Sequence, residues 1–238
     1  AERLVSFTNN SGPLFIIGTV GCMLFADTRT GVLLLLTHIL ACISVGFVMS
    51  FWKKNSKNSH HCSKKINSKK QAVTFSNLGE IISTSITNSI STILMIGGFV
   101  VIFSVVISIL NQTHITSFFG NAISPILQLY NIENPSQVGS SIFSGILELT
   151  NGISNLSNLH IKSLSQSICI SSFLLGFGGL SVLLQVYSII SKTDISIFPY
   201  FIGKVLHGIF AIIYTGILLS FDFFNLDLAL LTSILHIC

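Results

Sequence analysis

Charged side chains are scarce in this sequence. Of its 238 residues, 8% are charged and 50% are hydrophobic, and the mean hydropathy is +0.79. Because a soluble domain usually carries about 25% charged residues, this deficit excludes an ordinary soluble protein. Several apolar runs approach the length of about 20 residues that a membrane-spanning helix needs. The sequence therefore predicts an all-α integral membrane protein.

The sequence motifs of several enzyme classes are absent as well. There is no H-E-x-x-H, no G-x-S-x-G and no P-loop, so we expect no enzymatic activity and no cofactor. The odd number of scattered cysteines gives no disulfide framework; they are Cys22, Cys42, Cys62, Cys169 and Cys238. The first residues show no signal peptide, and we expect the chain to begin inside a longer one.

The few charges present are concentrated in one basic loop. Seven of the 12 lysine and arginine residues lie between positions 53 and 70. The positive-inside rule places this loop in the cytoplasm. Because no aromatic residue is interleaved beyond Trp52 at the membrane edge, we expect no nucleic-acid partner. His60, His61 and Cys62 lie in the loop without a second ligand pair at zinc spacing, so we expect no metal site.

Apolar runs of spanning length occur at 30–51, 91–110 and 195–221, and a further run at 168–190 contains the interruption "GFGG". Gly97 and Gly98 suggest a bend in the second run. The tail, 222–238, is apolar but short and is expected to lie at the interface.

Three shorter segments do not fit a simple crossing. Residues 72–90 carry apolar residues three or four apart, which predicts an amphipathic helix at the interface or along a polar cavity. Residues 115–131 predict a short interfacial helix, and Asn134-Pro135 predicts a turn. The apolar stretch 138–149 is too short to cross and predicts a re-entrant segment that ends at "ELTNG".

Two parts of the chain resemble each other. The stretch "PLFIIGTVG" at 13–21 aligns with "SSFLLGFGG" at 171–179 at a constant offset of 158 residues. Each copy precedes a spanning run with one interior histidine, and each has a Thr-Asn run upstream. We infer a duplication, hence a helical bundle of two related units that contain broken or re-entrant helices.

Repeats with interrupted apolar segments are typical of transporter cores, where unpaired backbone lines a cavity and helix ends favour an anionic ligand. The alternative is a loop at the membrane surface. The transporter interpretation predicts substrate-binding residues at the interruptions: Thr8, Asn9, Asn10, Ser11, Gly12, Thr150, Asn151, Gly152, Gly176, Gly178 and Gly179. Gly152 is expected to allow a left-handed or open backbone at the end of a half-helix.

Four ionisable residues lie in apolar surroundings, where such groups are costly and often functional. We assign Glu148, His38, His207 and Lys204 to proton coupling or to holding a helix end. For Lys204 the alternative is snorkelling to the interface. For each histidine the alternative is a hydrogen bond to a backbone carbonyl.

Four segments carry a resemblance to a known family: "SFTNNSGPLFIIGTVG", "TILMIGGFVVIFSVV", "GILELTNGI" and "SFLLGFGGLSV". Together they resemble the bacterial sporulation integral membrane proteins within the nucleoside-recognition, or Gate-domain, family. The family proteins are longer, so the chain resembles their C-terminal part. The resemblance implies the end of a first Gate-type repeat at 1–51, a basic loop at 52–71, a second repeat at 72–221 and a tail at 222–238.

The resemblance further implies a multi-pass protein in the mother-cell or forespore membrane of a spore former. Its expected function is transport of a small organic anion such as dipicolinate during maturation of the spore cortex and core. The expected partners are the lipid bilayer, the solute, and a second copy or other sporulation membrane proteins. A nucleoside gate, a metal-ion gate with His38, Glu148 and His207 as ligands, and a non-transporting scaffold remain alternatives.

Overall fold

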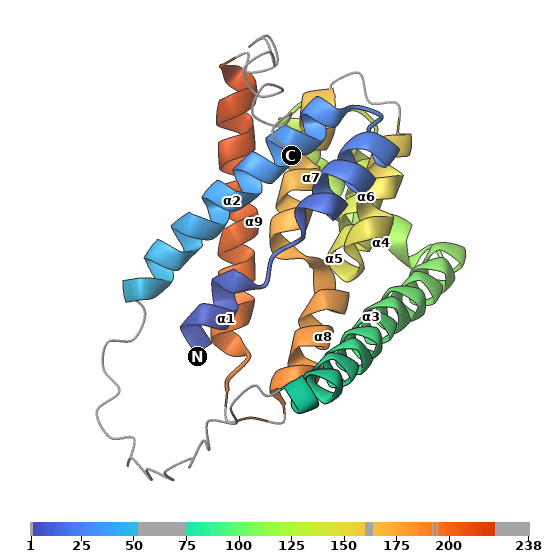
Figure 1. Ribbon diagram of the computed structural model, residues 1–238. Helices are drawn as coiled ribbons and strands as arrows, with labels where there is room; N and C mark the ends of the chain where they lie inside the picture. The colour runs from blue at the N-terminus through green and yellow to red at the C-terminus, as the bar shows by residue number, and fades with distance from the viewer. Residues whose placement is uncertain (1, 52–74, 160–163, 192, 194, 222–238) are drawn as a thin grey trace.

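The computed structural model describes residues 2–51, 75–159, 164–191, 193 and 195–221. The regular elements in these residues are helices, and no strand occurs among them (Figure 1). Four helical stretches in the described part are long and apolar enough to cross a membrane, at Thr28–Phe51, Leu78–Gln112, Leu164–Ile190 and Phe198–Ser220. The predicted all-α, multi-pass membrane protein is confirmed. The basic loop with His60, His61 and Cys62 and the tail lie outside the described residues.

Two long helices, α2 (Thr28–Phe51) and α9 (Phe198–Ser220), pack side by side in the bundle. The π-type helix η1 (Leu14–Leu24) packs on α2, and α7 (Leu164–Phe177) packs on α9. Both contacts are close because glycines meet in them. A Cβ on Gly21 would lie 2.6 Å from the Cα of Gly31, and a Cβ on Gly176 would lie 2.8 Å from the Cα of Gly208. Small residues let helices approach in this way inside membranes.

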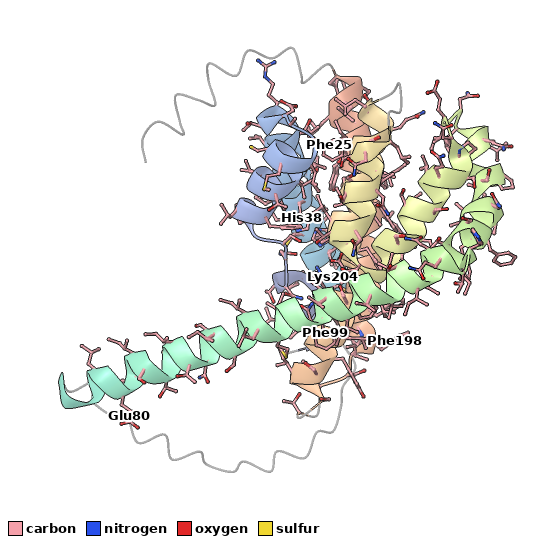
Figure 2. The ribbon with its side chains drawn as sticks, turned by 90° about the vertical axis from the view of Figure 1, so that its right-hand side faces the viewer. Phe25, His38, Glu80, Phe99, Phe198 and Lys204 are labelled. Carbon is pink, nitrogen blue, oxygen red and sulfur yellow. The ribbon has the colours of Figure 1, made fainter. Side chains whose placement is uncertain are left out.

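Helix α3 (Phe75–Gln112) corrects two predictions. The expected amphipathic helix at 72–90 and the expected span at 91–110 form one continuous helix of 38 residues, without a break at Gly97 and Gly98. The polar residues do not interrupt it, because hydroxyl groups bond the carbonyl four residues earlier, as Ser85 does to Ile81 and Thr92 to Asn88. In Figure 2 the half of α3 that carries Glu80 projects away from the bundle.

Three short helices follow α3: α4 (Ile115–Leu129), α5 (Pro135–Leu147) and α6 (Leu149–Asn158). The predicted short helix near 115–131 and the turn at Asn134-Pro135 are confirmed, and α5 begins three residues before the expected start at 138. Helices α4 and α5 pack closely, since a Cβ on Gly139 would lie 2.6 Å from the carbonyl oxygen of Gly120.

The helices are interrupted at three places where the sequence suggested it. The first break, residues 9–12, separates α1 (Glu2–Thr8) from η1. The second break is at Glu148, whose extended backbone separates α5 from α6. The third break is at Gly178, which has a φ of +85° and separates α7 from α8 (Gly179–Ile190). These breaks set the geometry of the candidate site.

Candidate functional site

The first break is fixed to α9 by two hydrogen bonds of Asn9. The side-chain amide of Asn9 donates to the hydroxyl of Tyr200 over 2.7 Å. The ammonium of Lys204 donates to the backbone carbonyl of Asn9 over 2.5 Å. The carbonyl is available because residues 9–12 are not helical, and unpaired backbone inside a membrane protein needs such a partner.

The other polar residues at the first break bond α1 or α2 rather than α9. The Asn10 amide donates to the carbonyl of Phe7 over 2.8 Å and to the sulfur of Cys42 over 3.0 Å. The Thr8 hydroxyl donates to the carbonyl of Leu4 over 2.8 Å. Ser11 is half-buried and Gly12 is exposed. Asn9 is therefore the member of this group that joins the break to the Lys204 face of α9.

The second break ends at the N-terminus of α6. The carboxylate of Glu148, 2% exposed, accepts from the backbone N–H of Thr150 over 3.0 Å and of Asn151 over 2.8 Å. Glu148 therefore occupies a helix end, one of the two roles considered for it; proton coupling stays a prediction. The Asn151 amide donates to the hydroxyl of Ser104 over 2.8 Å, which connects this break to α3.

The role expected for Gly152 is wrong. Its backbone is helical, within α6, and positive φ among the described glycines is confined to Gly178 and Gly179. Glycine is needed at 152 for close packing instead, because a Cβ there would overlap the Cα and nitrogen of Gly145 in α5. A helix-to-helix contact of this kind cannot be recognised from the motif "ELTNG" alone.

The second and third breaks lie against each other. A Cβ on Gly179 would lie 3.2 Å from the nitrogen of Leu149 and 3.5 Å from the carbonyl oxygen of Leu147, the residues on either side of Glu148. Gly178 and Gly179 both have positive φ, which other residues adopt only with strain. The sequence predicted each break separately but gave no sign that the two would meet.

A small cluster around Tyr200 connects all three breaks. Its buried members are Phe177, Leu183 and Tyr200, and Ile146 is one of the partly buried residues packed against them. Phe177 directly precedes the third break, and Ile146 lies two residues before the second. Tyr200 also bonds Asn9 of the first break. Sequence reasoning missed Tyr200, although its position four residues before Lys204 places both on one face of α9.

Lys204 and the two histidines lie inside the bundle. Lys204 is 3% exposed, which excludes the snorkelling alternative in this structure. It forms no ion pair with any described carboxylate; its partners are the Asn9 carbonyl and the Tyr200 ring, 6.0 Å from the ammonium. His38 and His207, 3% and 0% exposed, face each other with ring centroids 4.3 Å apart. Figure 2 shows His38 and Lys204 within the bundle.

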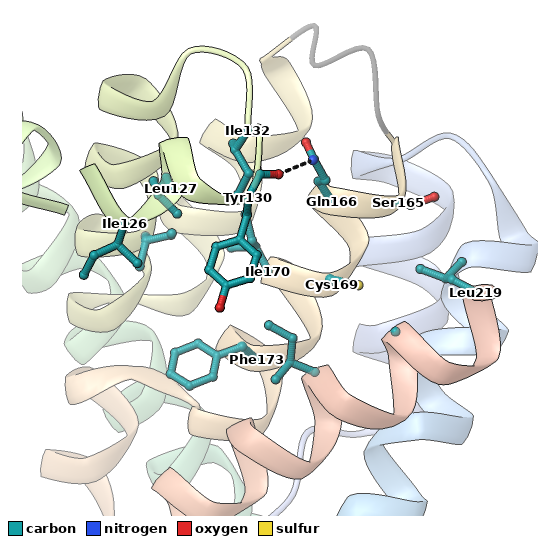
Figure 3. A pocket seen from close by; sticks show the side chains of 13 residues that line it. Ile126, Leu127, Tyr130, Ile132, Ser165, Gln166, Cys169, Ile170, Phe173 and Leu219 are labelled. Atoms are coloured by element: carbon teal, nitrogen blue, oxygen red, sulfur yellow. Dashed lines mark hydrogen bonds between the residues drawn. The ribbon is translucent and has the colours of Figure 1, made fainter. Parts of the chain in front are cut away.

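A separate cavity of about 770 Å³ lies between α4, α5, α7 and α9 (Figure 3). Its walls are mainly apolar, with Ile126, Ile170 and Leu219 among them, and Gln166 donates across it to the Tyr130 carbonyl over 3.4 Å. None of the predicted site residues lines this cavity. No group of three or more His, Cys, Asp or Glu side chains that could hold a metal ion occurs in the described residues.

Comparison with known proteins finds one similar sporulation protein. Over 234 residues the chain is 36% identical to the sporulation integral membrane protein YlbJ of Bacillus subtilis (strain 168). The chain resembles a sporulation integral membrane protein. The resemblance inferred from the four sequence segments is thus confirmed. The match to YlbJ covers 92% of this chain, and the chain spans 55% of the length of YlbJ.

The family described as nucleoside recognition, named Gate, matches residues 93–193. This region runs from within α3 to the end of α8, so it contains the second and third breaks. It lies inside the second unit expected at 72–221, while the two-unit division itself stays a prediction. No solved structure matches the chain.

Proposed function

We propose that this chain forms part of a sporulation membrane transporter that moves a small organic anion such as dipicolinate. The anion would bind beside the first break, next to the Tyr200 cluster that connects it to the other two. Support comes from the similarity to YlbJ, the nucleoside-recognition match and the broken helices, which are typical of transporter sites. The observation that carries the proposal is one buried positive charge on α9, which bonds the backbone of the first break.

Lys204 supplies that charge. An ionisable group inside a membrane bundle costs about 2.5–3.5 kcal/mol on insertion scales and usually pairs with another charge. Among the described residues, Lys204 has a neutral carbonyl as its hydrogen-bond acceptor and no carboxylate partner. A carboxylate of the solute would provide the missing countercharge, and an ammonium hydrogen-bonded to a carboxylate is among the stronger polar contacts.

A neutral donor beside Lys204 completes the proposed site. The Tyr200 hydroxyl accepts from Asn9, so its own proton is free to bond a second acceptor. The N-terminus of α6, by contrast, is already occupied, because Glu148 takes the N–H groups of Thr150 and Asn151. We therefore place the anion against Lys204 and Tyr200 rather than at the end of α6. The sequence-based hypothesis had included Thr150 and Asn151 among the substrate-binding residues, and the present proposal does not use them.

Transport by the full-length protein in proteoliposomes distinguishes the alternatives. Uptake of labelled dipicolinate, uridine and ferrous iron is measured at the same protein density. We expect uptake of dipicolinate alone, and Lys204→Met should reduce it about 10-fold or more, because a hydrogen bond to a charged group contributes about 1.5–3 kcal/mol. Uptake of uridine or iron instead would favour the corresponding gate. Correctly inserted protein without any uptake would favour the scaffold.

A further inference from the structure

A histidine pair with unsatisfied nitrogens lies between α2, which carries His38, and α9, which carries His207 on the same face as Lys204. His207 follows Lys204 by three residues, one helical turn. His207 Nε2 lies 3.0 Å from the backbone carbonyl of His38. Since a carbonyl only accepts, Nε2 carries the proton and Nδ1 of a neutral His207 keeps its lone pair.

The remaining nitrogens of the pair have no partner. His207 Nδ1 and both ring nitrogens of His38 are buried without a hydrogen bond among the described residues. Buried polar atoms are normally satisfied, and unsatisfied ones in a native structure call for an explanation. The pair thus offers two neutral imidazoles, each with a free lone pair, inside the bundle.

The helices around the pair carry positive charge but no described carboxylate. Two charged side chains belong to α2 and α9: Lys204, one turn before His207, and Arg29, which is exposed at the start of α2. Cys42, Tyr200 and Tyr214 are further titratable side chains on these two helices. On the neighbouring helices, Cys22 belongs to η1 and Cys169 to α7. None of the residues 4–8 of α1, and none of η1, α2, α7 and α9, carries a carboxylate. A proton added to the pair would therefore be repelled by Lys204, and these described segments offer no carboxylate that would stabilise it.

We propose that the His38–His207 pair takes up a proton when an anion binds at Lys204. The bound carboxylate neutralises the ammonium and removes the repulsion, so the free lone pair of His38 or His207 accepts a proton. This inference rests on the proposed anion function and adds the coupling ion to it. Linkage makes the coupling reciprocal: protonation of the pair strengthens anion binding by the same factor by which the bound anion strengthens proton binding. Anion binding should therefore become tighter as the pH falls and the pair is protonated.

Calorimetry on the full-length protein tests the coupling. The enthalpy of dipicolinate binding is measured near neutral pH in several buffers that differ in their enthalpy of ionisation. We expect the enthalpy to vary with the buffer, with a slope that corresponds to about one proton taken up per anion. The variant with both His38→Gln and His207→Gln should bind dipicolinate with a slope near zero, because glutamine can keep a hydrogen bond but takes no proton.

The matched control is His114→Gln, since His114 is an exposed histidine at the start of α4. It should leave the slope unchanged. Binding by the wild type with an enthalpy that is independent of the buffer would overturn the proton coupling and leave the anion site standing. An unchanged slope in the double variant would also overturn it. Absence of dipicolinate binding in the wild type would instead reject the proposed function.

Discussion

Individual residues carry the chemistry at the first break, where Lys204 supplies a charge and Asn9 and Tyr200 supply neutral hydrogen bonds. Lys204 and Asn9 could be found from the sequence, because a charge inside an apolar run and a polar run beside one are both visible there. The reason for Gly152 could not be found. It depends on how α5 and α6 fold back on each other, and the sequence does not encode that contact in any local pattern.

Replacing Gly152 by alanine tests the packing role. The new Cβ overlaps the backbone of Gly145, so we expect a loss of stability of about 1–3 kcal/mol, as for an overpacked core. Thermal unfolding of the purified protein in detergent measures it. The control is Gly98→Ala, where a Cβ meets nothing within 4 Å and better helix propensity should stabilise the protein slightly. Equal effects of the two substitutions would refute the packing role.

At the scale of whole elements, the interrupted runs were predictable and the uninterrupted one was not. "TNNSGP", "ELTNG" and "GFGG" place helix-breaking or helix-capping residues against apolar runs, and a break occurs at each. In α3 the same kinds of residue, serine, threonine and paired glycines, leave the helix intact. Their hydroxyls bond carbonyls of the same helix, and the glycines meet no neighbouring helix. Composition alone does not separate these two outcomes.

The start of α2 makes a prediction about pH. Asp27 accepts from the N–H groups of Arg29 and Thr30 over 3.1 and 2.9 Å and from the Thr30 hydroxyl over 2.7 Å. Burial raises the pKa of Asp27, but these hydrogen bonds and the Arg29 charge outweigh it and lower the pKa below its ordinary value of 3.8. The carboxylate therefore stabilises the fold above the unfolded pKa, and this contribution is lost as the pH falls through the lowered value.

We expect Asp27→Ala to lose about 1 kcal/mol of stability near neutral pH, the usual effect of removing an N-cap. The difference from wild type should shrink as the pH falls below about 4. Thermal unfolding over this pH range measures both quantities. Asp27→Asn is the control, because an asparagine cap accepts hydrogen bonds without titrating. A loss in Asp27→Ala that is the same at every pH would contradict the role of the charge.

Across the whole molecule, the sequence predicted the membrane class and the breaks but not how the breaks assemble. Helix α3 has 38 residues, about 57 Å at 1.5 Å per residue, against a hydrocarbon core of about 30 Å. The half of α3 that carries Glu80 projects from the bundle (Figure 2) and its residues 78–94 are exposed, which no local pattern of the sequence reveals. The meeting of the second and third breaks likewise depends on contacts between distant segments.

The orientation of the molecule stays a prediction of the lysine distribution. The loop at 53–70 should face the cytoplasm, the mother-cell cytosol in a sporulating cell. We expect Ser63→Cys, in a protein with Cys62 replaced, to resist an impermeant thiol reagent in intact cells and to react after lysis. Comparable labelling before and after lysis would reverse the orientation.

The most direct test of an anion site at the helix breaks is equilibrium binding of dipicolinate to purified full-length protein with altered charge at position 204. We expect Lys204→Arg to retain part of the affinity and Lys204→Met to lose about 10-fold or more, since one charge-assisted hydrogen bond disappears. Arg29→Gln removes an exposed charge at the start of α2 and should bind as the wild type does. If Lys204→Met bound dipicolinate with wild-type affinity while Arg29→Gln did so too, the buried lysine would not be the anion site.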